Sequence, residues 1–354
     1  MHARTAQDRH PRVSVLLPVR DAGRWLVEAI ESVLAQSEAS FELLLIDDGS
    51  RDTSAAIIDD HARRDPRIRV LATSDGNRGI APALTLALAQ ARAPYVARMD
   101  ADDRMHPRRL EMQLAALDDE PGLFGVSCRT RGFPDHDIRD GMREYLQWQN
   151  GLLTCEELAR DRFIESPVVH PSMTMRTAIL RDTLDGWRET VWAEDWDLFL
   201  RVFEAGLRLR RLPEVLLEWR LHAAQATRTD ARYSEEALLA ARAHFLARHL
   251  RRDVSTTRNV WILGAGPVGK HLIKALAREG VGSSGLADVD PRKIGGVVRD
   301  GARRWPVVAH SCLRQQVPRP FAISAVSGGA ARDRVRAELA GWGWTEGADF
   351  VVAA

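Results

Sequence analysis

Three aspartates follow a short apolar run in residues 95–103, at positions 100, 102 and 103. The run reads as a strand, so Asp100, Asp102 and Asp103 would crowd together at its carboxyl end. Carboxylates this close repel one another and are costly to desolvate unless a cation neutralises them. Hard oxygen ligands suit Mg²⁺ or Mn²⁺, which usually keep waters and share substrate phosphates. The pattern indicates a metal-held diphosphate, and hence a nucleotide-activated substrate.

A polar turn before a helix is the simpler interpretation of these aspartates, because Asp is common in turns and at helix N-termini. Taken alone, the triplet favours this simpler interpretation. A second acidic pair, Asp47 and Asp48, ends another apolar run at residues 41–46. The two acidic groups together make a site the stronger hypothesis.

The elements that position these groups alternate along the first hundred residues. Strands are predicted at 13–17, 41–46, 68–72 and 95–99, and helices at 25–35, 53–64 and 81–91. This order predicts a parallel sheet, in which ligands bind at the carboxyl ends of the strands. Both acidic groups fall at such ends.

The rest of the chain predicts further elements and a second domain. Residues 104–190 are less regular, with one helix predicted at 142–153, and a helix at 195–205 and a strand at 215–220 follow. A long helix at 231–250 is expected to join the two domains. In the last part, strands are predicted at 260–263, 285–289, 306–309, 321–326 and 350–352, and a helix at 270–278. We predict one domain over 1–225, a helical linker over 226–258, and a second domain over 259–354.

Composition narrows the class of protein. A length of 354 residues allows about two domains, each with its own core. A formal charge of +1 argues against a general electrostatic interaction with nucleic acid. No apolar run reaches the roughly 18 residues of a membrane span, and the N-terminus does not resemble a signal peptide. Three scattered cysteines fit reduced thiols. These features predict a cytoplasmic protein without stable membrane insertion.

Six short motifs follow one another within residues 12–225. They are VSVLLPVRD at 13–21, IDDGS at 46–50, NRG at 77–79, MDADD at 99–103, ED at 194–195 and WRLH at 219–222. In this order they resemble a family 2 glycosyltransferase of GT-A fold. The resemblance implies an α/β fold with a mixed, mostly parallel sheet, and transfer of a sugar from a nucleoside-diphosphate sugar.

The resemblance implies roles for residues at the donor nucleotide. Pro18, Arg20 and Asp48 would line the nucleobase site, with Asp48 accepting a hydrogen bond from a uracil-type ring N–H. Arg78 would lie near the base or the phosphates. One departure is Asp21, where the family usually has asparagine.

The resemblance also implies roles at the reacting groups. Asp100 would contact the ribose and metal-bound water, and Asp102 and His222 would hold Mn²⁺ or Mg²⁺. Asp195, beside Glu194, would be the general base that deprotonates the acceptor hydroxyl. One base and one cation imply direct displacement with inversion of configuration. Each role has a structural alternative, because acids favour the first turn of a helix and a lone histidine is usually a surface residue.

The second domain opens with a glycine-rich turn. Gly264, Gly266 and Gly269 follow a predicted strand and open a helix, and Asp288 lies 288 − 269 = 19 residues further on. This context is typical of a nucleotide-binding turn, with phosphate at the helix N-terminus and an acid on the ribose. The segment resembles the small Rossmann-like domain of some sugar acyltransferases. It predicts binding of a nucleotide or nucleotide-sugar, and the alternative is a scaffold that serves packing or dimerisation in a homodimer.

The leading hypothesis is a metal-dependent, inverting glycosyltransferase that uses a UDP- or dTDP-sugar. Its acceptor would be a surface glycan, a polysaccharide or a lipid-linked precursor, which would bring the enzyme to the inner membrane face only transiently. The first rival is a catalytically inactive module that binds nucleotide-sugars. The second is an NAD(P)-dependent oxidoreductase, which would rest on the glycine-rich turn alone.

Overall fold

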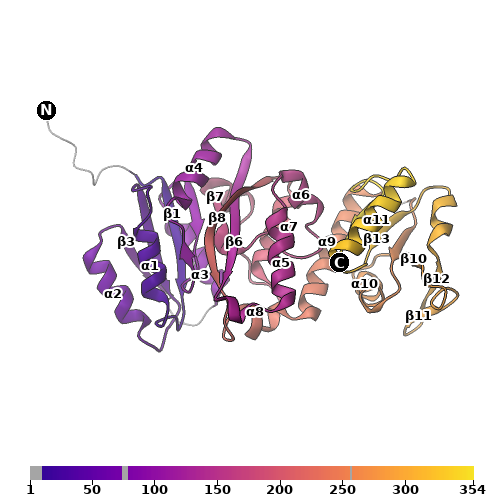
Figure 1. Cartoon of the computed structure of the whole chain (residues 1–354), viewed down its shortest axis with the longest axis horizontal. Coiled ribbons are helices and arrows are strands. Elements are labelled where there is room, and N and C mark those ends of the chain that lie inside the picture. The colour runs from indigo at the N-terminus through magenta and orange to yellow at the C-terminus, as the bar shows by residue number, and fades with distance from the viewer. Residues whose placement is uncertain (1–9, 74–78, 256) are drawn as a thin grey trace. The chain divides into compact units, whose positions relative to one another are not determined.

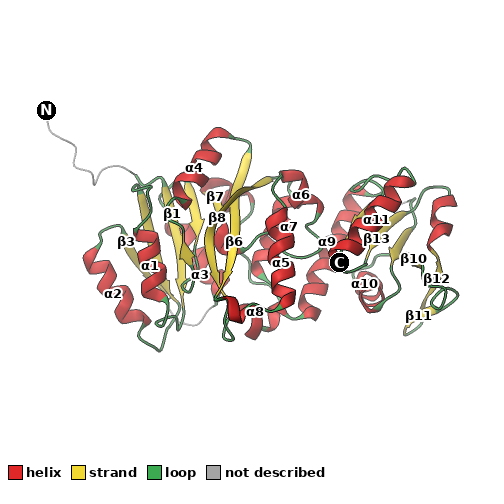
Figure 2. Ribbon diagram, viewed as in Figure 1, coloured by secondary structure: helices red, strands yellow, loops and turns green. Residues whose placement is uncertain are grey.

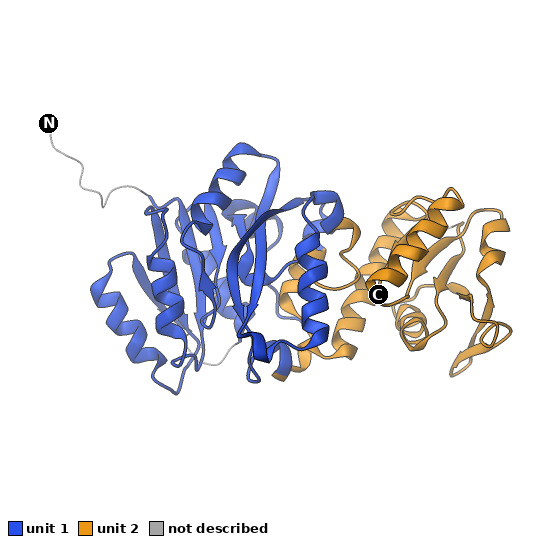
Figure 3. Ribbon diagram, in the orientation of Figure 1, with its two compact units in different colours: residues 1–158, 168–190, 201–228 blue, residues 159–167, 191–200, 229–354 orange. Residues whose placement is uncertain are grey.

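The computed structural model describes residues 10–73, 79–255 and 257–354. The chain divides into two compact units, which Figure 3 colours separately. The first unit holds the residues up to Leu158 together with Val168–Thr190 and Arg201–Arg228. The second holds Ala159–Pro167, Val191–Leu200 and Thr229–Ala354. Each unit has its own hydrophobic core.

The first unit is built around one mixed sheet with the strand order β3-β2-β1-β4-β7-β6-β8-β5 (Figure 1). Its strands are β1 (Val13–Val19), β2 (Phe41–Asp47), β3 (Ile68–Ala72), β4 (Tyr95–Arg98), β5 (Arg104–Met105), β6 (Leu123–Phe133), β7 (Thr174–Arg176) and β8 (Arg208–Arg220). Strands β1 to β4 run parallel, as do β6 and β8, whereas β7 is antiparallel to β4 and β6. The sequence prediction of a mixed, mostly parallel α/β fold is confirmed.

Helices cover both faces of the sheets and connect the strands, as Figure 2 shows. They are α1 (Leu26–Leu34), α2 (Ser54–Arg64), α3 (Ile80–Gln90), α4 (Arg109–Asp119), α5 (Asp140–Gly151), α6 (Cys155–Arg160), α7 (Glu194–Glu204), α8 (Ala226–Thr229), α9 (Glu235–Asp253), α10 (Pro267–Arg278) and α11 (Gly329–Gly341). Within the described part of the chain, none of these helices combines the length and apolarity that a bilayer crossing needs.

Strand β1 explains why the acidic residues gather at one edge of this sheet. Its sequence, VSVLLPV, is apolar at nearly every position and almost entirely buried, as expected of a central parallel strand covered on both faces. Alternate residues of β1 pack with α1, α2 and α4 in one core cluster. Helix α3 contacts β1 and β2 with buried residues outside that cluster, so it covers the opposite face. Helices therefore cover both faces of the sheet, and the carboxyl ends of the parallel strands are left open.

The predicted βαβα segment is observed nearly residue for residue, but the middle of the chain is more regular than predicted. Residues 104–190 contain α4, the eleven-residue strand β6 and the short strand β7. Strand β6 carries polar and small residues (LFGVSCRTRGF), so its apolar pattern is weak. Pairing with the distant β8 and β7 stabilises it, and this pairing cannot be seen in a local window.

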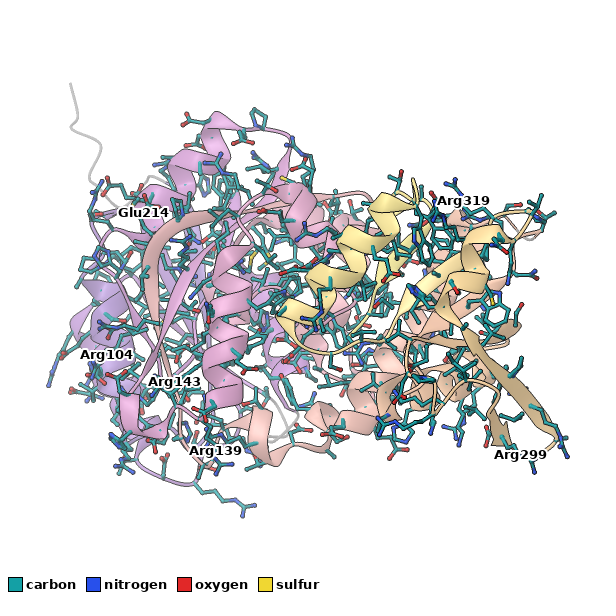
Figure 4. All side chains as sticks on the ribbon, turned by 45° about the vertical axis from the view of Figure 1, so that its right-hand side comes forward. Arg104, Arg139, Arg143, Glu214, Arg299 and Arg319 are labelled. Carbon is teal, nitrogen blue, oxygen red and sulfur yellow. The ribbon has the colours of Figure 1, made fainter. Side chains whose placement is uncertain are left out.

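The second unit contains another sheet, with the strand order β11-β12-β10-β9-β13-β14. Its strands are β9 (Val260–Leu263), β10 (Ser283–Asp288), β11 (Val297–Asp300), β12 (Arg303–Ala309), β13 (Phe321–Ser324) and β14 (Phe350–Val352). All run parallel except β11, which pairs antiparallel with β12 and places Arg299 opposite Arg304. Figure 4 labels Arg299 on this hairpin.

The segment predicted as a linker, 226–258, contributes α8 and α9. Helix α9 begins at Glu235, and the Ser234 side chain caps it by accepting a hydrogen bond from the Ala237 amide. Its buried residues Ala241, Phe245 and Leu246 belong to the core of the second unit. The helix is thus an integral part of that unit.

Candidate functional site

The three aspartates of the MDADD motif lie where β4 ends. Strand β4 is entirely buried between β1 and β7, and the Met99 amide continues the ladder by donating to the Leu16 carbonyl at 3.0 Å. Asp100, Asp102 and Asp103 each offer a carboxylate oxygen, and these atoms lie within 4.8 Å of one another. Such a group of oxygen donors can hold a divalent cation.

Asp103 is the buried member of this acidic cluster, with no exposed surface. Its Oδ1 accepts a hydrogen bond from the Arg220 amide at 2.8 Å, and its Oδ2 has no hydrogen-bond partner in the described part of the chain. Burial, together with the charges of Asp102 and Asp100, raises its pKa well above the ordinary value. A cation beside the cluster would remove this cost of ionisation.

Asp100 is paired with a buried arginine. The Arg98 side chain is only 2% exposed, and its Nη1 donates to Asp100 Oδ1. Burial raises the pKa of Asp100, the Arg98 charge opposes this effect, and the Asp102 charge adds to it, with a net upward shift.

His222, which lies just after β8 in the sequence, is close to the acidic cluster. Its Nε2 lies 2.8 Å from Asp102 Oδ2, and its Nδ1 is buried without a hydrogen-bond partner among the residues described. Within the described ranges, Asp103 Oδ2 therefore lacks a hydrogen-bond partner beside the other two carboxylates, whereas His222 Nδ1 points to the opposite side of the imidazole ring from Asp102. The donors beside a cation would be the three carboxylates and His222 Nε2. This set of oxygen and nitrogen donors fits a cation such as Mn²⁺, which accepts both kinds of ligand, and also Mg²⁺, which prefers the oxygens.

The loop after β1 approaches the loop after β2 at the same sheet edge. Pro18 pairs with Ile46 in the parallel ladder, and Arg20 follows as an exposed residue. Asp21 has a left-handed backbone (φ 48°), a conformation in which Asn and Asp are enriched. This conformation suits an aspartate at the position where the resemblance leads us to expect asparagine. Its Oδ1 accepts from the Arg51 amide at 2.8 Å, which ties the two loops together.

Asp48 hydrogen-bonds to Thr73, just after β3, and to Gly79, just before α3. It is 3% exposed, its Oδ1 accepts from Thr73 Oγ1 at 3.0 Å, and its Oδ2 accepts from the Gly79 amide at 2.8 Å. Contact of Asp48 with a nucleobase stays a prediction. Arg78, predicted near the base or phosphates, lies outside the described residues.

Glu194 and Asp195 begin α7 and lie in the second unit, where their environments differ. Glu194 is completely buried, accepts from the Tyr233 hydroxyl at 3.2 Å, and has Arg232 at 3.6 Å. Asp195 is half-buried, and its Oδ1 accepts from the Trp196 amide. Of the two, Asp195 is therefore the better placed to reach a substrate, and its relation to the acidic cluster stays a prediction.

The glycine-rich turn of the second unit joins β9 to α10. Gly264 has φ 97°, and a Cβ on Gly269 would lie 1.9 Å from the Gly264 carbonyl oxygen, so both positions require glycine. Asp288 Oδ2 accepts from the Ala265 amide at 2.7 Å and from Lys293 Nζ at 3.0 Å. Asp288 thus fastens this turn to the end of β10. Gly266, the N-cap of α10, completes the set of predicted residues.

Two residues of the first unit were missed by the sequence prediction. Arg98 is a charged residue inside an otherwise apolar strand, and this anomaly was a usable signal. Trp25, which contacts His222, had no local signal, because an aromatic residue at a helix start usually belongs to the core.

Comparisons with known proteins agree with this geometry. The family model "Glycosyl transferase family 2" matches residues 14–184. EpsE of Bacillus subtilis, which is named as a glycosyltransferase, is 33% identical over 214 residues, covering 59% of this chain and 73% of EpsE. Chondroitin synthase of Escherichia coli is 28% identical over 199 residues, covering 56% of this chain but only 27% of that protein.

Solved structures show the same fold. A TarS fragment of S. aureus in complex with UDP-GlcNAc superposes with a TM-score of 0.53 at 17% identity, covering 75% of this chain and 80% of that one. The UDP complex of the fragment gives a TM-score of 0.50 at 19% identity, covering 68% and 72%. The chain belongs to glycosyltransferase family 2. It is a glycosyltransferase with a GT-A-like first unit.

Proposed function

We propose that this protein is a metal-dependent, inverting glycosyltransferase that transfers a sugar from a UDP- or dTDP-sugar to an acceptor hydroxyl. The observation that carries the proposal is the acidic cluster at the end of β4, joined by His222 from β8's end. The complexes of TarS with UDP and UDP-GlcNAc support a nucleotide-sugar donor.

In this proposal Asp102 and His222 hold the cation, and Asp100 contacts the ribose and metal-bound water. The cation, Mn²⁺ or Mg²⁺, would supply Lewis-acid stabilisation of the charge that develops on the departing diphosphate. Pro18, Arg20, Asp48 and Arg78 line the nucleotide side.

Asp195 accepts the proton of the attacking acceptor hydroxyl. Glu194 supports the first turn of α7, which carries Asp195. Since attack by the acceptor and departure of the diphosphate occur in one displacement, the anomeric configuration inverts. A second carboxylate nucleophile, which double displacement needs, has no place in this scheme.

The acceptor class and the second unit belong to the same proposal. EpsE and the chondroitin synthase support an acceptor in surface glycan or polysaccharide synthesis, reached by a cytoplasmic enzyme at the inner membrane face. The rigid glycine turn beside Asp288 supports a Rossmann-like second unit that binds a nucleotide or nucleotide-sugar. The alternative for that unit is packing or dimerisation.

Release of nucleoside diphosphate from a panel of UDP-, dTDP- and GDP-sugars, with and without Mn²⁺, tests the proposal. We expect turnover only with a divalent cation, and a loss of at least a hundredfold in Asp102→Asn, about the scale of one strong transition-state contact. Unchanged turnover in Asp102→Asn would refute the metal role. Tight binding of a nucleotide-sugar without turnover of any acceptor would favour the rival, an inactive binding module.

A further inference from the structure

The indole ring of Trp25 packs against the imidazole ring of His222. The ring centroids are 4.1 Å apart, and the planes meet at 34°. Trp25 is the N-cap residue of α1 and is half-buried, whereas His222 lies just beyond the end of β8. The contact thus joins two segments about two hundred residues apart in the sequence, at the acidic cluster.

We infer that Trp25 is a positioning residue, which orients the His222 ring so that its Nε2 faces Asp102 and the cation proposed above. This inference rests on the proposed function, because it takes His222 to be a ligand of the cation. Trp25 would restrict the rotation of the imidazole ring, whereas other contacts hold the backbone of His222.

The imidazole ring needs such a support. Among the residues that the structure describes, the His222 ring is held by one hydrogen bond, from Nε2 to Asp102 Oδ2, and a single hydrogen bond leaves the ring able to turn about that axis. Nδ1 has no hydrogen-bond partner within the described residues and therefore does not stop this rotation. A flat aromatic surface against one face of the ring does, because stacked rings lose contact when one turns. Metal-binding histidines are usually oriented by a hydrogen bond from their other ring nitrogen. His222 Nδ1 makes no such bond in the described part of the chain, so the indole is the contact that can orient the ring.

The start of helix α1 contacts the Arg220–His222 segment at two places. Trp25 packs on His222, and Glu28, three residues further along, forms an ion pair with Arg220. Residues three apart lie on one face of a helix, and residues two apart lie on one face of an extended segment. The first turn of α1 therefore lies alongside the Arg220–His222 segment. The Trp25–His222 contact is one of the two contacts that align them.

The backbone of His222 is held separately. Gln225 Oε1 accepts from the His222 amide at 3.1 Å, and Gln225 Nε2 donates to the Arg220 carbonyl. Asp103 accepts from the Arg220 amide on the other side. Since these bonds fix the main chain without Trp25, removal of the indole should free the ring while the loop stays in place.

The test measures Mn²⁺ affinity in the presence of UDP, by calorimetry or by electron paramagnetic resonance, for Trp25→Leu, Trp25→Phe and His222→Ala. We expect Trp25→Leu to weaken Mn²⁺ binding roughly 10–100-fold, as for other contacts that orient a ligand, and Trp25→Phe to retain most of it. In the His222→Ala background, Trp25→Leu should cause no further loss. Val27→Ala, an exposed position on the same helix, is the matched control and should bind like the wild type.

A second readout uses the metal-free protein. The ¹⁵N shifts of the His222 imidazole, assigned by their absence in His222→Ala, should change in Trp25→Leu and return toward the wild type in Trp25→Phe. Wild-type affinity and unchanged shifts in Trp25→Leu would overturn the inference, as would losses that multiply in the double variant. If the wild type itself binds no Mn²⁺ with UDP, the proposed function fails, while the imidazole shifts still decide whether Trp25 orients the ring.

Discussion

The Oδ1 atom of Asp103 accepts a hydrogen bond from the backbone amide of Arg220 at 2.8 Å, across 117 positions of the sequence. This bond fastens the end of β8 to the acidic loop and places His222 beside Asp102. Asp103 therefore anchors β8 to the acidic cluster, in addition to offering a carboxylate oxygen to it.

This relationship predicts different outcomes for two substitutions. Asp103→Asn keeps an oxygen that can accept from Arg220, whereas Asp103→Ala leaves a buried amide unpaired. We expect Asp103→Ala to be less stable than Asp103→Asn by about 1–3 kcal/mol, the cost of an unsatisfied buried group. Urea unfolding without divalent cations measures this difference. Equal free energies of unfolding would show that the bond does not anchor β8.

Cation binding should release protons. Burial and neighbouring carboxylates raise the pKa of Asp103 and, despite Arg98, of Asp100, so these groups stay protonated to a higher pH than usual. A cation binds the ionised forms, so its affinity should fall as the pH is lowered into the raised range. Titration of Mn²⁺ in two buffers of different ionisation enthalpy should give different apparent heats, and the difference should shrink in Asp103→Asn. Identical heats in both buffers for the wild type would contradict the raised pKa values.

The two acids of α7 should respond differently to neutralisation. Asp195→Asn removes the proposed base, and we expect kcat to fall roughly 10²–10⁴-fold with little change in melting temperature. Glu194→Gln disturbs a buried carboxylate held by Tyr233 and Arg232, so a lower melting temperature should accompany any loss of activity. Tyr233→Phe, which removes one donor to Glu194, is the control for this second effect. Full activity in Asp195→Asn would exclude this residue as the base.

Acid stability should depend on Glu42 in β2. This buried carboxylate accepts from Ser14 Oγ at 2.6 Å and from the Arg92 amide at 2.8 Å, and it pairs with Arg69 at 2.6 Å. Burial alone would raise its pKa, but these partners outweigh burial and lower it from 4.5.

A lowered pKa in the folded state means that the unfolded chain takes up the proton first as the pH falls. The stabilisation by Glu42 is thus present above pH 4.5 and is lost as the pH falls through the folded-state pKa. The stability difference between wild type and Glu42→Gln should be largest near neutral pH and should shrink in acid. A difference that is constant with pH would argue against the lowered pKa.

The strands and helices of the first half of the fold could be predicted because each depends on a short, local sequence pattern. The apolar runs that form β1 to β4 and the amphipathic helices between them are visible within short windows, and their alternation predicts a parallel sheet. For the same reason Asp48 and Asp100 could be placed at the carboxyl edge. The family motifs then indicated which acids would face a ligand.

The sequence by itself determined the acidic cluster, the family and the alternation of strands and helices, because each depends on residues close together in the chain. Only the tertiary structure decided that Asp103 anchors β8, that Arg98 pairs with Asp100, and that Trp25 packs on His222. Strand β6 likewise forms through partners far along the chain. Such contacts arise between surfaces that meet only after the sheet has formed, so no periodicity in one segment encodes them.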